Sequence, residues 1–212
     1  MNPLALAALA TAIIATNGKQ VHPIWQNETR LRQYQVAWTS LNKSTNVTYY
    51  QVSATELMSV DIYTNHGQQP KAKLICWSVK MSNLDQGNET GVREYSYTYA
   101  GANSEYFINE EVKTVSMLNY SIKNAVQYEY TKGETHADPV IFTDGKMCDL
   151  LNVPKASSKD GCELWVNSDY KDNVPPCCSF IYDLLCAVEK SYDIYDKQQC
   201  KSVVQSLEKK FQ

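Results

Sequence analysis

CELWVNSDYKDNVPPCCSFIYDLLC, residues 162–186, decides the fold, because its hydrophobic pattern changes partway along and it holds four of the seven cysteines. Residues 163–166 are typical of a short strand with one charged side chain, and residues 169–173 of a polar loop. After two prolines, apolar residues recur with helical spacing: Phe180, Ile181, Leu184, Leu185 and Val188. A strand is thus joined to a helix that cysteines would fix against another element. This arrangement predicts a small secreted barrel with a buried acid, which is a design for ligand binding.

The N-terminus indicates export. Residues 4–15 are an apolar run followed by Thr16, Asn17 and Gly18. The run is too short for a bilayer, which takes about 20 residues, but it fits the hydrophobic part of a signal peptide; a buried helix is the alternative. We therefore expect a signal peptide over residues 1–18 and a secreted single domain over residues 19–212, which is long enough for a sizeable core. No later apolar run is long enough to cross a membrane.

Sequons and cysteines fit the same compartment. Seven cysteines in an exported chain are typical of disulfides rather than of metal ligands. The chain has no Cys-X-X-Cys pair and its three histidines form no helical pair, so we expect no metal site and no cofactor. N-glycosylation is predicted at five Asn-X-Ser/Thr motifs: Asn27, Asn42, Asn46, Asn88 and Asn119.

Charge and aromatic content narrow the class of partner. The net charge is −3 and the basic residues are scattered, which argues against nucleic-acid binding. Fifteen tyrosines combine apolar rings with hydroxyl groups, a composition that suits the wall of a ligand pocket. We therefore expect a monomer with a small-molecule partner.

The middle of the chain predicts an antiparallel sheet. An N-terminal helix is expected over residues 30–41, and a last short helix over residues 198–211. The apolar face of the first helix would consist of Leu31, Tyr34, Ala37, Trp38 and Leu41. Between the two helices the pattern is one of short alternating runs broken by turn residues, with no crossover helix. This favours a closed up-and-down barrel or a sandwich. The expected strands are residues 47–55, 57–63, 72–82, 91–100, 105–117, 122–131, 138–142, 146–152 and 162–167.

The order of these elements carries a family resemblance. Ala37-Trp38 on the first helix, a meander of about eight strands, Cys162-Glu163-Leu164-Trp165 and a Cys-bearing helix resemble the histamine-binding lipocalins of tick saliva. The resemblance implies a mostly β fold, an eight-stranded antiparallel up-and-down lipocalin barrel with an N-terminal helix and a C-terminal helix packed outside. Amine-binding members of that family carry an acid before Ala-Trp. Val36 takes its place here, whereas Glu-Leu-Trp is intact.

The same resemblance implies how the cysteines pair. A cysteine in the middle of the barrel bonds the C-terminal segment, and one on a late strand bonds the helix: Cys76–Cys200 and Cys148–Cys178. Cys162 would then pair with Cys186 and leave Cys177 odd, although Cys162–Cys177 is an alternative. Each bridge would constrain the unfolded chain by roughly 2–4 kcal/mol.

These pairings set the phase of three strands, because a cysteine bonded to an outer helix must point outward and side chains alternate. The residues so predicted to face inward are Ile75, Trp77 and Val79, then Asp149 and Leu151, then Glu163 and Trp165. A ligand ammonium between a carboxylate and an indole would gain charge pairing and cation–π attraction. Alternatively, internal partners neutralise Asp149 and Glu163, and Arg93 is a candidate partner.

Other candidates come from the neighbouring strands. Tyr95, Tyr97 and Tyr99, together with Tyr49, have a period of two and either fill the barrel or line its cavity. Tyr106 and Glu111 lie on the next strand, and Glu110 competes with Glu111 for the inward position. Trp38 either plugs the barrel end or contacts the ligand. The candidate ligand-binding residues are Glu163, Trp165, Asp149, Trp77, Glu111, Tyr95, Tyr97 and Trp38.

The functional hypothesis is ligand sequestration and not catalysis. No histidine has the context of a catalytic triad, and the two acids lack a supporting glycosidase motif. The sequence therefore predicts a secreted lipocalin that binds a host biogenic amine, histamine or serotonin, in its barrel. One alternative is a scavenger of a lipid mediator, a leukotriene or fatty acid, held by Arg93. Another is a barrel scaffold that binds a host immune protein.

Overall fold

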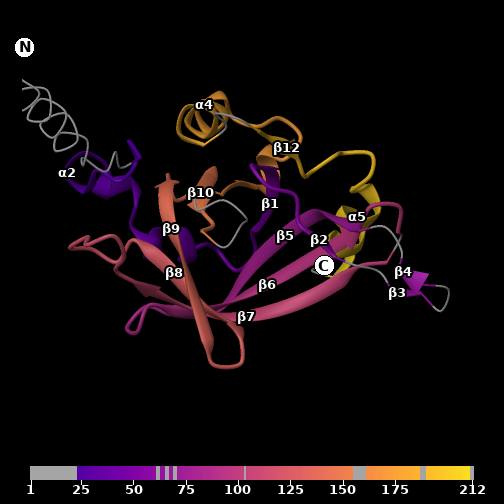
Figure 1. Ribbon diagram of the computed structural model, residues 1–212, viewed down its shortest axis with the longest axis horizontal. Helices are drawn as coiled ribbons and strands as arrows, with labels where there is room; N and C mark the ends of the chain where they lie inside the picture. The colour runs from indigo at the N-terminus through magenta and orange to yellow at the C-terminus, as the bar shows by residue number, and fades with distance from the viewer. Residues whose placement is uncertain are drawn as a thin grey trace, which may run out of the picture.

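The strands of this protein curl into a barrel with helices outside it (Figure 1). The computed structural model describes residues 23–60, 63–64, 67–68, 71–102, 104–154, 161–186 and 190–210. The predicted signal peptide, residues 1–18, lies outside this part of the chain.

Eight strands form the barrel wall. Each strand pairs antiparallel with its sequence neighbour in the order β5 to β11, and β1 pairs with both β11 and β5, which closes the sheet. This topology confirms the predicted fold class. The barrel strands are β1 (Thr48–Ala54), β5 (Ala72–Asp85), β6 (Thr90–Tyr99), β7 (Tyr106–Val115), β8 (Ala125–Thr131), β9 (Glu134–Thr143), β10 (Cys148–Asn152) and β11 (Cys162–Asn167).

The predicted strand over residues 57–63 is wrong in extent. In the structure β2 covers only Ser59–Val60, both exposed, and pairs with the first residues of β5. A strand whose residues are both exposed lacks the packing that stabilises longer strands, and residues 61–62 of the predicted strand lie outside the described ranges. The remaining short strands are β3 (Tyr63–Thr64), β4 (Gly67–Gln68) and β12 (Tyr192–Asp193), of which β12 pairs with β1.

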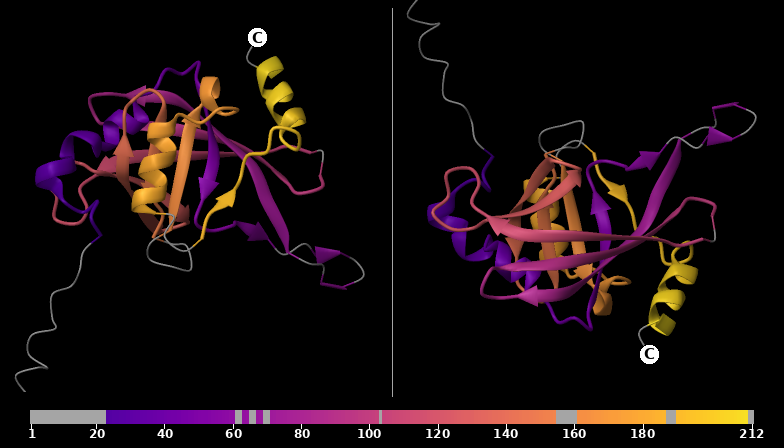
Figure 2. Two further views of the ribbon diagram at one scale, coloured as in Figure 1. Left: turned by 90° about the horizontal axis from the view of Figure 1, so that it is seen from above. Right: turned by 90° about the horizontal axis from the view of Figure 1, so that it is seen from below.

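The predicted continuous helix over residues 30–41 is also wrong. Gln35 interrupts it, because its buried side-chain amide donates to the carbonyls of Trp25 at 2.8 Å and Ile141 at 3.0 Å. Val36 is then extended, so the residues before and after the break do not share one face. The segment consists of α2 (Glu28–Leu31), a 3₁₀ turn η1 (Arg32–Tyr34) and α3 (Ala37–Leu41), and Figure 2 shows these helices at one end of the barrel.

The later helices lie outside the barrel (Figures 1 and 2). After the 3₁₀ turn η2 (Ser168–Tyr170), α4 (Pro176–Leu185) is tied to β10 and β11, and α5 (Lys201–Lys210) to β5. None of the helices in the described ranges is both long and apolar enough to span a bilayer. The structure contains three disulfides, with Cys177 as an exposed free thiol: Cys76–Cys200, Cys148–Cys178 and Cys162–Cys186.

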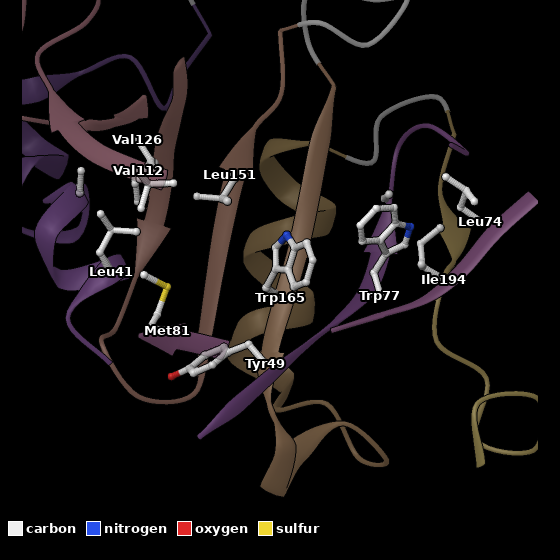
Figure 3. Close-up of a cluster of buried hydrophobic side chains, with 13 residues drawn as sticks. Leu41, Tyr49, Leu74, Trp77, Met81, Val112, Val126, Leu151, Trp165 and Ile194 are labelled. Carbon is white, nitrogen blue, oxygen red and sulfur yellow. The ribbon is translucent and has the colours of Figure 1, made fainter. Parts of the chain in front are cut away.

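The outward cysteines give β10 and β11 the predicted alternation. Leu150, Leu164 and Val166 pack outside under α4, whereas Leu151 and Trp165 belong to the interior cluster. Figure 3 shows this interior, with Leu41 and Met81 near the α3 end, Trp165 in the middle, and Trp77 beyond it beside Leu74 and Ile194. The barrel interior is therefore lined largely by apolar and aromatic side chains, and the polar groups inside it lie among them.

One inward assignment on β5 is wrong. Trp77 lies inside and Val79 packs against the interior cluster, but Ile75 packs outside with Cys76, and Leu74 takes the inner position. The cause is a bulge: Cys76 has φ 58° and the β5–β6 register shifts between Ile75 and Ser78. A bulge adds one residue to the strand and so interrupts the alternation of side chains.

Candidate functional site

Acidic side chains from three strands gather in the middle of the barrel around one guanidinium. Arg93 on β6 is buried and lies opposite Glu110 on β7, with 3.7 Å between Nη1 and Oε2. Its Nη1 also donates to the Tyr95 hydroxyl at 3.2 Å. Asp138 on β9 and Glu163 on β11 are close enough to interact electrostatically with the same guanidinium. Three acids thus share the positive charge of Arg93.

Glu163 points into the barrel beside Trp165. The Trp165 indole N–H donates to Glu163 Oε2 at 3.0 Å. The barrel walls surround this carboxyl, and burial raises its pKa, whereas hydrogen bonds from Trp165 and Gln51 and the charge of Arg93 oppose the rise. Glu163 is therefore an acid whose charged form would gain from another nearby cation.

Asp138 is a second inward acid, and it is not among the residues predicted from the sequence. It is only 6% exposed, and its Oδ1 accepts a hydrogen bond from the Tyr128 hydroxyl at 3.3 Å. Burial raises the pKa of Asp138 to about 8, and the charges of Glu163 and Glu110 add to the rise while Arg93 opposes it. Its only signal in the sequence is its position two residues before Val140 on a predicted strand.

Asp149 also faces inward, but the chain supplies its cation. Lys43, on the connection between α3 and β1, places Nζ 3.1 Å from Asp149 Oδ1, and the Thr143 hydroxyl donates to the same oxygen at 2.5 Å. The alternative of an internal partner therefore describes Asp149 correctly, although the partner is Lys43 and not Arg93. Lys43 is not among the residues predicted from the sequence, because loop residues have no periodicity that indicates the direction of their side chains.

The inward assignment of Glu111 is wrong. Glu111 is exposed, whereas Glu110 pairs across the sheet with the buried Arg93 and shares its face with the buried Val112. Adjacent residues on a strand point to opposite faces, so only Glu110 can reach the interior.

Aromatic rings form a continuous wall between the acids and the barrel end away from α3. Tyr95 lies 5.9 Å from Trp165 and 5.8 Å from Trp77, measured between ring centroids. Trp77 stacks on Tyr97 at 4.3 Å, and Tyr97 stacks on Tyr106 at 5.6 Å. The Trp77 indole N–H is buried and makes no hydrogen bond with the described residues. This wall offers π faces and one unused donor to a ligand.

The predicted residues do not all meet at one point. A cavity of about 30 Å³ lies between the α3 end and the acids, lined in part by Lys43, Arg93, Tyr95, Asp149 and Trp165. It has room for about two water molecules, so an amine must displace neighbouring side chains. Trp38 packs against the interior cluster from α3 and is not among the lining residues. Within the described ranges, no group of three or more His, Cys, Asp or Glu could hold a metal ion.

A closed antiparallel barrel with a polar and aromatic interior and helices outside defines a lipocalin-type ligand-binding protein. The chain belongs to one particular group of these: the tick histamine-binding protein family, whose model matches residues 25–202. The family and the fold are those of ligand-binding proteins.

Two curated relatives come from the tick Rhipicephalus appendiculatus. The chain is 28% identical to the male-specific histamine-binding salivary protein over 186 residues, which cover 85% of this chain and 88% of the relative. It is 23% identical to female-specific histamine-binding protein 1 over 199 residues, covering 90% and 95% of the two chains. Among solved structures, Japanin from the same tick, bound to cholesterol, has a TM-score of 0.49 and 13% identity, covering 74% of this chain and 97% of Japanin.

Proposed function

We propose that this chain is a secreted scavenger of a small biogenic amine, of the histamine or serotonin class, which it binds inside its barrel. The observation that carries the proposal is the charge balance of the interior. Glu110, Asp138 and Glu163 face one guanidinium, that of Arg93, whereas Asp149 is neutralised by Lys43. Buried acids without enough cations are costly to ionise and tend to hold a proton, as the raised pKa values of Asp138 and Glu163 indicate, and a ligand ammonium would favour their charged forms.

Glu163 is the principal anchor in this proposal. Its carboxylate and the Trp165 indole share one wall of the barrel, so an ammonium between them would gain a charge-assisted hydrogen bond and cation–π attraction. Trp77, Tyr95 and Tyr97 extend the aromatic surface on which the ring of such an amine can stack. Because the cavity is small, we expect Tyr95 or Trp165 to change rotamer on binding.

Secretion and glycosylation remain part of the proposal. One curated relative is named a salivary protein, and three disulfides fit an oxidising compartment. The asparagines of all five sequons are exposed, which is where glycans can be accommodated: Asn27, Asn42, Asn46, Asn88 and Asn119. Glycosidase treatment of the protein secreted from insect cells should lower its mass, and a product that retains residues 1–18 would contradict export.

The family supports an amine more than a lipid acid. Both curated relatives are named for histamine binding, although Val36 occupies the position where the amine-binding pattern has an acid. Arg93, the candidate partner for a lipid carboxylate, is already bonded to Tyr95 and Glu110 and has further acids around it. A lipid carboxylate would therefore meet repulsion at that place.

Calorimetry with a matched ligand panel tests the proposal. We expect histamine or serotonin to bind to the wild-type protein with a stoichiometry of one, and a long-chain fatty acid to give no heat of binding. The corresponding alcohol, with a hydroxyl in place of the ammonium, has nearly the same shape but lacks the ammonium charge, and it should bind at least 10-fold more weakly. Equal affinity for the amine and the alcohol would overturn the proposal.

A further inference from the structure

The buried pair of Lys43 and Asp149 has the composition of an amine-binding site. The side chains of Lys43 and Asp149 are 3% and 9% exposed, and Nζ lies 3.1 Å from Oδ1. The same Nζ is 4.9 Å from the centroid of the Tyr49 ring. Carboxylate and aromatic face are the two groups that recognise an ammonium ion.

The backbone around Lys43 directs its side chain into the barrel. Lys43 follows the last residue of α3 by two positions, and its N–H donates to the Leu41 carbonyl at 2.7 Å. Its neighbours Asn42 and Ser44 are exposed, so the connection reaches solvent on both sides while the Lys43 side chain enters the barrel. A lysine here could extend into water at little cost, yet it places its ammonium on Asp149.

We infer that Lys43 is a tethered ammonium that fills a second cation site inside the barrel. Asp149 accepts hydrogen bonds from Lys43 and Thr143, and Tyr49 supplies the aromatic face. Lys43, Tyr49 and Asp149 all line the cavity of about 30 Å³. Because the ammonium that fills this site is part of the chain, a free amine is excluded from the α3 end. In the wild type, free amine is thereby restricted to the centre formed by Arg93 and Glu163, a restriction that rests on the proposed function.

Lys43→Ala tests this inference. The change removes Cγ, Cδ, Cε and Nζ, the same atoms that n-propylammonium supplies as a free ion. It leaves the buried Asp149 without its cation, so the thermal midpoint should fall. Added n-propylammonium should then raise the midpoint of Lys43→Ala by about 3 °C or more, while the wild type shifts by less than about 1 °C. 1-Propanol, which has the same length and no charge, should not rescue either protein.

The double variant Lys43→Ala/Asp149→Asn is the matched control. It has the same cavity without the carboxylate, so n-propylammonium should shift its midpoint no more than it shifts the wild type. If Lys43→Ala does not fold alone, refolding in n-propylammonium should recover it, and the double variant should fold without the ion. Absence of rescue in the single variant, or equal rescue of single and double variants, overturns the inference.

A further arm separates this inference from the proposed function. Rescue by n-propylammonium should persist in Lys43→Ala/Glu163→Gln, because the two sites use different acids. If the rescue persists while the wild type binds no amine, the tethered-ammonium site stands and the proposed function fails. If the wild type binds an amine and Lys43→Ala gains no additional equivalent of bound ammonium by calorimetry, this inference fails alone.

Discussion

Two acid sites share the interior of this barrel, and they differ in how their charge is balanced. At the α3 end, Asp149 is matched one-to-one by Lys43. In the middle, three acids are set against the single guanidinium of Arg93. Residue type is therefore a poor guide to function inside a barrel: a buried acid is available to a ligand cation only where the chain does not supply its own.

The largest expected effect is on the balanced site. Asp149→Asn leaves the buried Lys43 ammonium without its charge partner, and breaking a buried pair in this way costs on the order of 3–5 kcal/mol. Urea unfolding should show that loss in the free energy of unfolding. Lys43→Met/Asp149→Asn, which removes both charges, should recover most of it. A single variant as stable as the wild type would show that the pair is not desolvated.

Around Arg93, where acids outnumber cations, removing an acidic charge should stabilise the protein. Burial raises the pKa of Asp138 to about 8, above the usual aspartate value of 3.8. A carboxyl with a higher pKa in the folded chain favours folding while it is protonated, so its contribution to stability is present at low pH and is lost as the pH rises from about 4 to 8.

Asp138→Asn should therefore match the wild type near pH 4 and exceed its stability at pH 8, by about 1–3 kcal/mol in urea unfolding. Asn keeps an oxygen for the Tyr128 hydroxyl, so the change isolates the charge. The exposed Asp183→Asn is the control and should have no such pH dependence. A destabilised Asp138→Asn at pH 8 would mean that Arg93 already compensates this acid.

A smaller effect is expected from the hydrogen bond that orients Glu163. Trp165→Phe keeps an aromatic ring on the barrel wall but removes the N–H that donates to Glu163 at 3.0 Å. We expect amine affinity to fall by about 0.5–1.5 kcal/mol, the net value of one such bond. Calorimetry on this variant should show weaker amine binding with unchanged stoichiometry. A loss larger than that of Glu163→Gln would make the indole, and not the carboxylate, the main anchor.

The sequence predicted the parts of this site that are fixed by local alternation. Outward Cys148 and Cys162 set the inward direction of Asp149 and Glu163, because no bulge separates each acid from its cysteine. The predicted inward direction of Ile75 was wrong because the bulge at Cys76 shifts the alternation of side chains. On β7 the adjacent Glu110 and Glu111 stand in a stretch without clear periodicity, so only the pairing with Arg93 distinguishes them.

The remaining parts depend on contacts that are distant in sequence. The first helix is broken by the hydrogen bond from Gln35 to Ile141, which lies 106 residues away. Lys43 and Asp149 are also 106 residues apart, and no local pattern pairs a loop lysine with a strand acid. Propensity and periodicity describe neighbours along the chain, so they cannot predict these long-range pairs.

The most direct test of the account compares two glutamates under one change. Glu163→Gln removes the charge of the proposed anchor and Glu111→Gln removes the charge of an exposed residue, and both keep the side-chain shape. Calorimetric titration with histamine or serotonin should show an affinity loss of roughly 30-fold or more for Glu163→Gln, the cost of a lost buried charged hydrogen bond. Glu111→Gln should bind like the wild type. Unaltered amine affinity in Glu163→Gln, or an equal loss in both variants, would contradict the account.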